Sequence, residues 1–346
     1  MSERYAHVLA MLQGAVWVIQ PEKLAAIREV IRLRVSGGGL SDTEIRERLA
    51  LGPDEEMPRA PRPAKMAGVA VLPLYGFLCP KANMVTEYSG GTSLESFQRA
   101  YRAALADPAA GSIVLDVDSP GGLSYGVEET WDLVYGARKQ KRTVAVVSPS
   151  AGSGAYWIAT AAEEIVITPS GDAGSVGAYT MHEDLTAALE AEGVKLEIIR
   201  AQASPRKVEA NPFEPLTEDA RAYAQAQVDE VMASFVKAVA KGRGVSPAAV
   251  VKGFGGGRMV MARAAVAAGM ADRVGTLDEV IGRLAGRKPA PAGTRAAATL
   301  EPGMYTAEEL ASAIEVAEEP PPADTGEAER ERLRVALDLI DARRKA

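Results

Sequence analysis

Two kinds of side chain are almost missing from this chain of 346 residues. It contains one cysteine, Cys79, and two histidines, His7 and His182. A single cysteine excludes a disulfide within the chain and any zinc site built from several cysteines. Two histidines argue against most histidine-ligated metals and against a Ser-His-Asp triad. Any chemistry must therefore proceed almost without imidazole, and we expect neither a metal nor another cofactor.

A net positive charge and long apolar runs are also absent. Lys and Arg number 39 against 46 Asp and Glu, a net charge of −7, and no basic stripe indicates nucleic-acid binding. The longest apolar stretch near the N-terminus, Val8 to Ile19, is interrupted by Gln13 and follows Glu3 and Arg4. It is shorter than the ~20 residues of a membrane span and lacks the features of a secretion signal. We expect a cytoplasmic protein with no membrane anchor and no nucleic-acid partner.

Composition divides the chain into three parts. Residues 1–64 are predicted to be a helical segment, with a helix starting at Pro21, followed by a proline-rich linker. Residues 65–285 form the expected core. Residues 286–346 are a linker rich in proline, alanine and acidic residues, followed by a charged helix over Ala328 to Arg344.

Within the expected core, short apolar runs alternate with helical spacing. Because the apolar runs lack polar alternation, they predict a layered α/β core of βαβ units, with a sheet covered on both faces. The expected strands are 69–74, 112–117, 143–147, 164–168 and 196–200, and the expected helices are 93–105, 127–138, 155–162 and 217–241.

Three predicted strands end in small residues, where ligands bind in open α/β sheets. The first such segment, Asp118 to Gly122, contains two adjacent glycines. Their exposed N–H groups suit an oxyanion hole, and an ordinary strand-to-helix turn is the other interpretation.

The second segment places Ser153 between two glycines, directly after a strand and before a helix. This is the pattern of a nucleophile elbow, in which small neighbours permit a sharp turn that presents the hydroxyl. A serine that caps the helix is the alternative, and Ser150 competes for that role. Tyr156 and Trp157, which follow, are expected in the core.

The third segment, Gly171 to Gly177, contains Ser175, which could hydrogen-bond a catalytic group; a tight loop that needs glycines is the simpler interpretation. A serine nucleophile also needs a base, and with so few histidines a lysine is the candidate. Lys207 lies in a loop before the predicted long helix, although most lysines are merely solvated.

Taken together, these motifs resemble the signal peptide peptidase A family of serine peptidases over about residues 65–285. The resemblance rests on Asp118 to Gly122, Ser153 to Ala159 and Gly174 to Gly177, on Lys207 before Asn211-Pro212-Phe213 and Leu216-Thr217, and on Lys241 to Gly244. It implies the Clp-protease/crotonase-like α/β fold and a Ser–Lys dyad.

The resemblance also implies a role for each residue of the site. Ser153 would be the nucleophile and Lys207 the general base, with Ser175 orienting the lysine. The N–H groups of Gly154 and of Gly121 or Gly122 would form the oxyanion hole. Two positions depart from the family pattern: Ser204 stands where the family often has glycine, and Arg206 adjoins the lysine.

One branch of the family fits the N-terminal half further. Tyr5-Ala6-His7, Pro21 to Leu24 and Ser89 to Ser93 resemble the capsid-maturation proteases of tailed phages, often called minor capsid protein C. This implies a homo-oligomer that cleaves polypeptides, namely capsid and scaffold proteins, inside the procapsid in the host cytoplasm. The tail after residue 286 would then serve in scaffolding or have no function.

Three other functions remain open from the sequence. One is a crotonase-like acyl-CoA enzyme, which uses paired N–H groups to stabilise an enolate and needs no elbow serine. Another is a capsid or scaffold component without activity, and the third is a cytoplasmic peptidase of the host.

Overall fold

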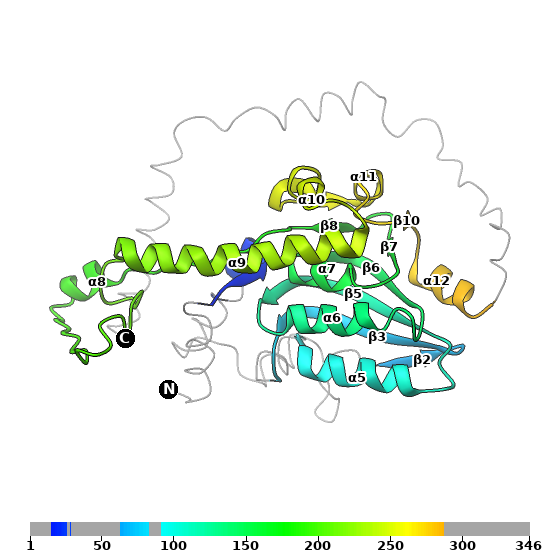
Figure 1. Ribbon diagram of the computed structural model, residues 1–346, viewed down its shortest axis with the longest axis horizontal. Helices are drawn as coiled ribbons and strands as arrows, with labels where there is room; N and C mark the ends of the chain where they lie inside the picture. Colours follow the sequence, from blue (N-terminus) through cyan, green and yellow to red (C-terminus); the bar gives the residue numbers. More distant parts are fainter. Residues whose placement is uncertain (1–14, 26–27, 29–62, 83–90, 287–346) are drawn as a thin grey trace, which may run out of the picture. The chain divides into compact units, whose positions relative to one another are not determined.

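The computed structural model of the protein describes residues 15–25, 28, 63–82 and 91–286. These residues form a mixed β-sheet with helices on both faces (Figure 1). The tail from residue 287, with the helix expected at 328–344, lies outside the described residues.

The sheet has five parallel strands at its centre, bounded on one side by an antiparallel one. In spatial order these are β10 (Arg273–Val274), β7 (Glu164–Ile167), β6 (Thr143–Gly152), β5 (Ser112–Leu123), β3 (Val69–Cys79) and the antiparallel β2 (Ala64–Met66). Four shorter strands attach at the carboxyl ends: β4 (Thr92–Ser93) to β3, β8 (Asp172–Gly174) to β6, β9 (Met259–Met261) to β8, and β1 (Trp17–Ile19) to β5.

Helices cover the two faces of this sheet unequally. On one face lie α5 (Leu94–Ala106), α6 (Val127–Gly136) and α7 (Gly154–Ala159), with α9 (Glu218–Arg243) packed outside α6 and α7. On the other, α12 (Leu277–Leu284) covers a cluster of strand valines. The remaining described helices are α8 (Thr186–Ala191), α10 (Pro247–Gly253), the 3-10 turn η1 (Gly255–Gly257) and α11 (Ala262–Ala267). No described helix is both long and apolar enough to cross a membrane.

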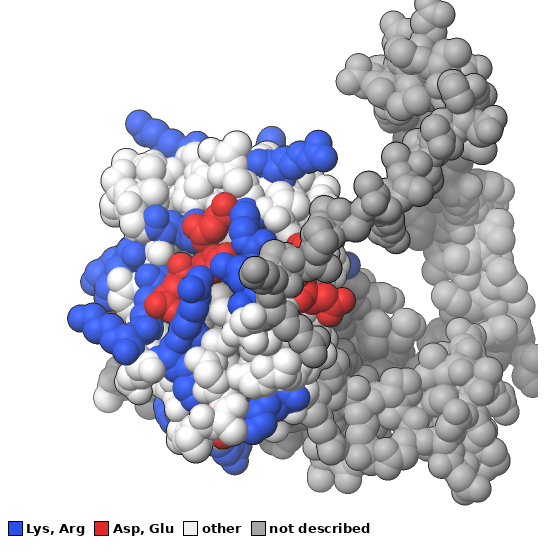
Figure 2. Space-filling view, turned by 90° about the vertical axis from the view of Figure 1, so that its right-hand side faces the viewer, with Lys and Arg blue, Asp and Glu red and all other residues white. Residues whose placement is uncertain are grey.

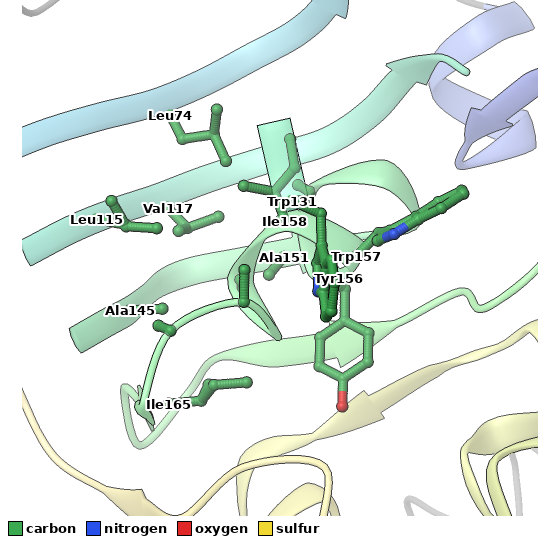
Figure 3. Packing of buried hydrophobic residues seen from close by; sticks show 14 of the residues in the cluster. Leu74, Leu115, Val117, Trp131, Ala145, Ala151, Tyr156, Trp157, Ile158 and Ile165 are labelled. Atoms are coloured by element: carbon green, nitrogen blue, oxygen red, sulfur yellow. The ribbon is translucent and has the colours of Figure 1, made fainter. Parts of the chain in front are cut away.

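The core is organised around the short helix α7, whose six residues are all buried. Trp157 stacks on Phe235 of α9 with ring centroids 4.6 Å apart, and the Tyr156 hydroxyl donates a hydrogen bond to the carbonyl of Met270 at 2.9 Å. Figure 3 shows these side chains pointing away from α7 in different directions, so that one helix holds the sheet, α9 and the segment before β10 together. The prediction that Tyr156 and Trp157 belong to the core is confirmed.

The predicted α/β core is confirmed, with two differences in the strands. The strand expected at 196–200 is absent, and this stretch is an exposed, irregular segment. The segment Asp118 to Gly122 is no turn but continues β5, with Gly121 opposite Phe77 and Gly122 opposite Leu78. A Cβ on Gly122 would lie 1.9 Å from the Leu78 carbonyl oxygen. The glycine is therefore needed for the close approach of β3.

The N-terminal segment also differs from the helical prediction. Residues 17–19 form β1, a strand of the core sheet that pairs antiparallel with β5, while the chain turns helical at Pro21 as predicted. The sequence Trp-Val-Ile has the aromatic and β-branched side chains that favour a strand. All three residues are buried, so residues before the proline-rich linker belong to the core sheet.

Charged side chains at the α12 end of the sheet form a network around Glu164. Its carboxylate binds three arginines: Arg142 from the loop before β6 at 2.9 Å, Arg273 from β10 at 2.9 Å and Arg283 from α12 at 2.7 Å. Figure 2, viewed from that side, shows acidic side chains surrounded by Lys and Arg. Burial raises the pKa of Glu164, but the hydrogen bonds from the three arginines outweigh it and hold the pKa below its usual value.

We predict that Glu164→Gln lowers the free energy of unfolding by about 1–3 kcal/mol at neutral pH, because three guanidinium groups lose their shared carboxylate. The folded-state pKa lies below the unfolded value of about 4.3. The stabilisation is therefore fully present above that value and is lost as pH falls through the folded pKa. Urea unfolding of both chains between pH 7 and 3 measures the difference.

Glu192→Gln is the matched control, because Glu192 is exposed and its substitution should change the free energy of unfolding by less than about 0.5 kcal/mol. A difference between wild type and Glu164→Gln that stayed constant down to pH 3 would contradict the network's contribution.

Candidate functional site

Ser153 stands at the turn between β6 and α7 in a backbone conformation that is unusual for serine. Its φ is 51° and its ψ is −116°, a region that is costly for residues with a side chain. Its N–H donates to the Gly174 carbonyl at 2.7 Å. Among the described residues, its Oγ has one hydrogen-bond partner, the Gly177 carbonyl, to which it donates at the long distance of 3.3 Å. This is the sharp strand-to-helix turn expected of a nucleophile elbow.

Neither serine near this turn caps α7 with its side chain. Ser153 occupies the N-cap position, yet its side chain accepts no hydrogen bond from the helix. The Ser150 hydroxyl donates instead to the Asp172 carboxylate at 2.6 Å. The helix-cap interpretation is therefore wrong for both residues, and strain at Ser153 persists without a capping hydrogen bond that would explain it.

The glycines on either side of Ser153 are required by close neighbours. A Cβ on Gly152 would lie 3.1 Å from the Pro120 carbonyl oxygen and 3.0 Å from Nε2 of Gln20. A Cβ on Gly154 would lie 2.9 Å from Cγ2 of Val18. A side chain at either position would therefore force its neighbours to shift, because the turn lies close to β5 and the N-terminal segment.

The two candidate oxyanion-hole glycines of β5 differ in their hydrogen bonds. The Gly121 N–H donates to the Ser119 hydroxyl at 3.1 Å, and that hydroxyl donates to the Gly76 carbonyl at 2.6 Å. Gly121 is therefore held by a buried serine that sequence reasoning did not identify. Gly122 pairs with Val18, and alternation along the strand directs its N–H toward β1, the side on which Ser153 lies.

The strand β1 is the second feature that sequence reasoning missed. The Val18 carbonyl oxygen would lie 2.1 Å from a Cβ on Gly121 and 3.2 Å from one on Gly154. A backbone carbonyl of this chain thus sits between the glycine strand and the start of α7. The short apolar run before Pro21 could have suggested a strand, but it does not indicate with which strand it pairs.

Ser175 lies next to the nucleophile turn. It directly follows Gly174, whose carbonyl accepts the Ser153 N–H, and it is buried with a φ of 51°. Its N–H donates to the Arg258 carbonyl at 2.9 Å. Among the hydrogen bonds of the described residues none joins Ser175 to a lysine, so its expected orienting role is not observed within one chain.

Lys207 lies on a separate projection of the chain, residues 185–217, which we call the arm. None of the residues of the arm is buried. The contacts that hold it are internal or go to the start of α9: the Leu185 N–H donates to the Pro212 carbonyl at 2.8 Å, Arg200 binds Glu214, and Arg206 binds Asp219 at 2.9 Å. Arg206, the cation beside the lysine, is thus already paired with a carboxylate.

The helix α9 sets the distance between the arm and Ser153. Its residue Phe235 contacts Trp157, four residues after Ser153, whereas the arm precedes Glu218 at the other end. Those 17 residues of helix span roughly 25 Å. Figure 1 shows the arm beyond the N-terminal end of α9, away from the sheet. Ser153, Ser175 and the glycines are brought together, and Lys207 is not.

The sequence model of Peptidase family S49 matches residues 136–290. This segment includes Ser153, Ser175 and Lys207, whereas Gly121 and Gly122 lie before it. Capsid assembly protease C of Escherichia phage lambda is 32% identical over 213 residues, 61% of this chain and 48% of that protein. Head-tail preconnector protein GP5 of Enterobacteria phage P21 is 32% identical over 201 residues, 57% of this chain and 40% of that protein.

Protease 4 of Haemophilus influenzae is 25% identical over 198 residues, 57% of this chain and 31% of that protein. Among solved structures, a variant of the 1510-N membrane-bound stomatin-specific protease covers 61% of this chain and 81% of its own, at 17% identity and a TM-score of 0.38. The chain spans less than half the length of the two phage proteins that it matches. The turn at Ser153 thus lies inside the segment of the chain that is similar to peptidase family S49.

Proposed function

We propose that this chain is a serine endopeptidase with Ser153 as nucleophile. The observation that carries the proposal is the turn itself: a serine held at positive φ between two glycines, with a hydroxyl that makes only one long hydrogen bond. The match of residues 136–290 to a peptidase family and the similarity to proteins named as proteases support the same activity.

The reaction is acyl transfer. Ser153 Oγ attacks the carbonyl carbon of a peptide while its proton passes to a base, and the resulting oxyanion accepts hydrogen bonds from the N–H groups of Gly122 and Gly154. The tetrahedral intermediate collapses to an acyl-enzyme as the amine leaves with that proton. Water, deprotonated by the same base, then attacks the ester and releases the acid and Ser153.

The base in this proposal is Lys207 of another copy of the chain. Lysine acts as a base only as a neutral amine, which burial favours, and Lys207 is exposed on the arm. The arm and the start of α9 also expose apolar side chains, including Ile199 at 90%, Leu196 at 55% and Tyr223 at 61%. Contact with a neighbouring copy would cover these side chains, desolvate Lys207 and deliver it to Ser153.

The proposed substrates are capsid and scaffold proteins of a phage. This rests on the similarity to capsid assembly protease C of phage lambda and to the head-tail preconnector protein of phage P21. The proposed place of action is the procapsid in the host cytoplasm, with a homo-oligomer of this chain as the active form.

A second candidate function is supported by the position of Lys207. Within one chain no titratable side chain of the described residues hydrogen-bonds Ser153 Oγ, as would hold for a capsid or scaffold component that has lost activity. The two candidates differ in whether Ser153 reacts, so the following measurements separate them.

We predict that Ser153→Ala abolishes both the adduct with a fluorophosphonate probe and cleavage of a scaffold-type substrate, with a loss of at least about 10⁴-fold. The free energy of unfolding should change by less than about 0.5 kcal/mol, because the side chain caps nothing. Thr276→Ala, which removes the capping box of α12, should cost about 1 kcal/mol and leave labelling intact. Intact-mass spectrometry and urea unfolding measure the two effects.

We predict that the variants Ser153→Ala and Lys207→Ala, each inactive alone, regain activity when unfolded together, mixed in equal amounts and refolded. If each site combines residues of two neighbouring copies, about one quarter of the sites receive an intact serine and an intact lysine. Initial cleavage rates of the mixture, relative to wild type at the same total concentration, measure this fraction.

Lys195→Ala is the matched control, since Lys195 is another exposed lysine of the arm and its variant should retain wild-type activity. A mixture with no activity, beside a fully active Lys195→Ala, would contradict a dyad shared between copies. A probe adduct on none of the folded chains would favour the inactive scaffold component.

A further inference from the structure

The strand β1 lies along β5 as an added peptide strand would. Trp17, Val18 and Ile19 stand opposite Leu123, Gly122 and Gly121 in antiparallel register. The pairing extends one residue to each side, since the Gln20 N–H donates to the Pro120 carbonyl at 3.0 Å and the Ser124 N–H to the Val16 carbonyl at 3.2 Å. Such strand addition is a common way to bind extended peptides.

The other edge of β1 is paired as well. The Trp17 N–H donates to the Tyr179 carbonyl at 2.8 Å, and the Tyr179 N–H donates to the Trp17 carbonyl at 3.1 Å. β1 therefore lies between two backbone edges, Gly121 to Leu123 on one side and Tyr179 on the other. Ser153 is next to both regions: the following residue, Gly154, lies against Gly121 and Val18, and Ser153 Oγ donates to the carbonyl of Gly177, two residues before Tyr179.

Val18 lies against the glycine end of β5 and the start of α7. Its carbonyl oxygen lies against Gly121 and Gly154, on the side to which the Gly122 N–H points. Its side chain is fully buried in the main core cluster, with Cγ2 at 2.9 Å from the place of a Cβ on Gly154. The carbonyl and side chain of Val18 thus fill the space beside the nucleophile.

We infer that β1 is a built-in pseudosubstrate, which occupies the peptide groove of Ser153 and must leave before another polypeptide can enter. The inference rests on the proposed function, because it takes the space beside Ser153 as the place of cleavage. It also assigns a substrate class: an extended segment with a small aliphatic residue at the place of Val18, flanked by residues whose side chains face Phe77 and Leu123.

The strength of this block follows from its attachment to the chain. A tethered strand competes with a free peptide at an effective concentration in the millimolar range. Its three side chains are at most 1% exposed, and Trp17 packs near Phe77 with ring centroids 6.2 Å apart. A free peptide of the same sequence should therefore bind the intact chain poorly and bind well once β1 is displaced.

The test compares two aspartates placed in the same segment. Val18→Asp places a carboxylate in an apolar, buried position and should expel β1, whereas Ala25→Asp places it at an exposed position. Both are made on the full chain with Ser153→Ala, so that binding is measured without cleavage. The probe is the fluorescent peptide Ala-Val-Trp-Val-Ile-Gln, identical to residues 15–20, followed by fluorescence anisotropy.

We expect the peptide to bind the Val18→Asp chain at least ten times more tightly than the Ala25→Asp chain, which should behave like its parent. Equal binding to both, or no binding to a Val18→Asp chain that retains its melting transition, would overturn the inference.

A second measurement applies if Val18→Asp does not fold. Hydrogen exchange of the chain that carries Ser153→Ala as its single substitution is followed while the unlabelled peptide is added in excess. Displacement should speed exchange at the amides of Trp17, Val18 and Gln20 while the amide of Val114, in the middle of β5, stays protected. Protection of the β1 amides that does not change in saturating peptide would overturn the inference.

Labelling distinguishes this inference from the proposed function. With Ser153 present, Val18→Asp should react with the fluorophosphonate probe several times faster than Ala25→Asp. A Val18→Asp chain that binds the peptide tightly but forms no adduct would reject Ser153 as the nucleophile, and β1 would then be a displaceable strand that covers a peptide-binding groove. Equal labelling rates together with equal peptide binding would reject the strand alone.

Discussion

Three backbones meet beside Ser153 at distances that admit no side chain. A Cβ on Gly121 would lie 3.0 Å from both the Gly152 oxygen and the Gly154 nitrogen, besides its contact with Val18. The carboxyl end of β5, the last residues of β6, the start of α7 and β1 all depend on this crossing. Because the glycines allow it, Ser153 is held at positive φ without a compensating capping bond, and the Gly154 nitrogen lies close to Gly121.

Rigidity around this crossing comes from groups that touch no substrate. The Ser119 hydroxyl ties Gly121 to the Gly76 carbonyl, and α7 is fixed from behind by the Trp157–Phe235 stack and the Tyr156 hydrogen bond. Buried hydrogen bonds and aromatic stacking of this kind each contribute on the order of 1 kcal/mol. They hold the turn in one geometry, as the proposed stabilisation of an oxyanion would require.

Features determined by nearby residues could be predicted from the sequence. The apolar runs at 69–74, 112–117, 143–147 and 164–168 became strands, and the helices before and after Ser153 fell where their spacing placed them. The elbow was also readable, because its pattern of strand, glycine, serine, glycine and helix lies within a few residues. The fold class and the sharp turn at Ser153 were thus accessible, although the roles of Ser153, Ser175 and Lys207 remain proposals.

Features determined by distant residues could not be predicted. The glycines of Asp118 to Gly122 suggest a turn when taken alone, and only the neighbouring β3 and β1 explain why they are extended. The run Trp17 to Ile19 carries no sign of a partner a hundred residues away. The sequence likewise identified Lys207 as a candidate base for Ser153 but gave no distance between them. The length of α9 determines how far apart the two residues lie.

If the dyad is shared between copies as proposed, the separation of the arm from Ser153 has a kinetic consequence. When nucleophile and base are joined only through an encounter of two chains, the rate of hydrolysis rises more steeply than in proportion to the concentration of the protein. Dilute, newly made chains would therefore be almost inert toward other proteins, while the same chains gathered in a small volume would become active together. The 26-residue helix α9 would in this way make crowding itself the signal that starts proteolysis.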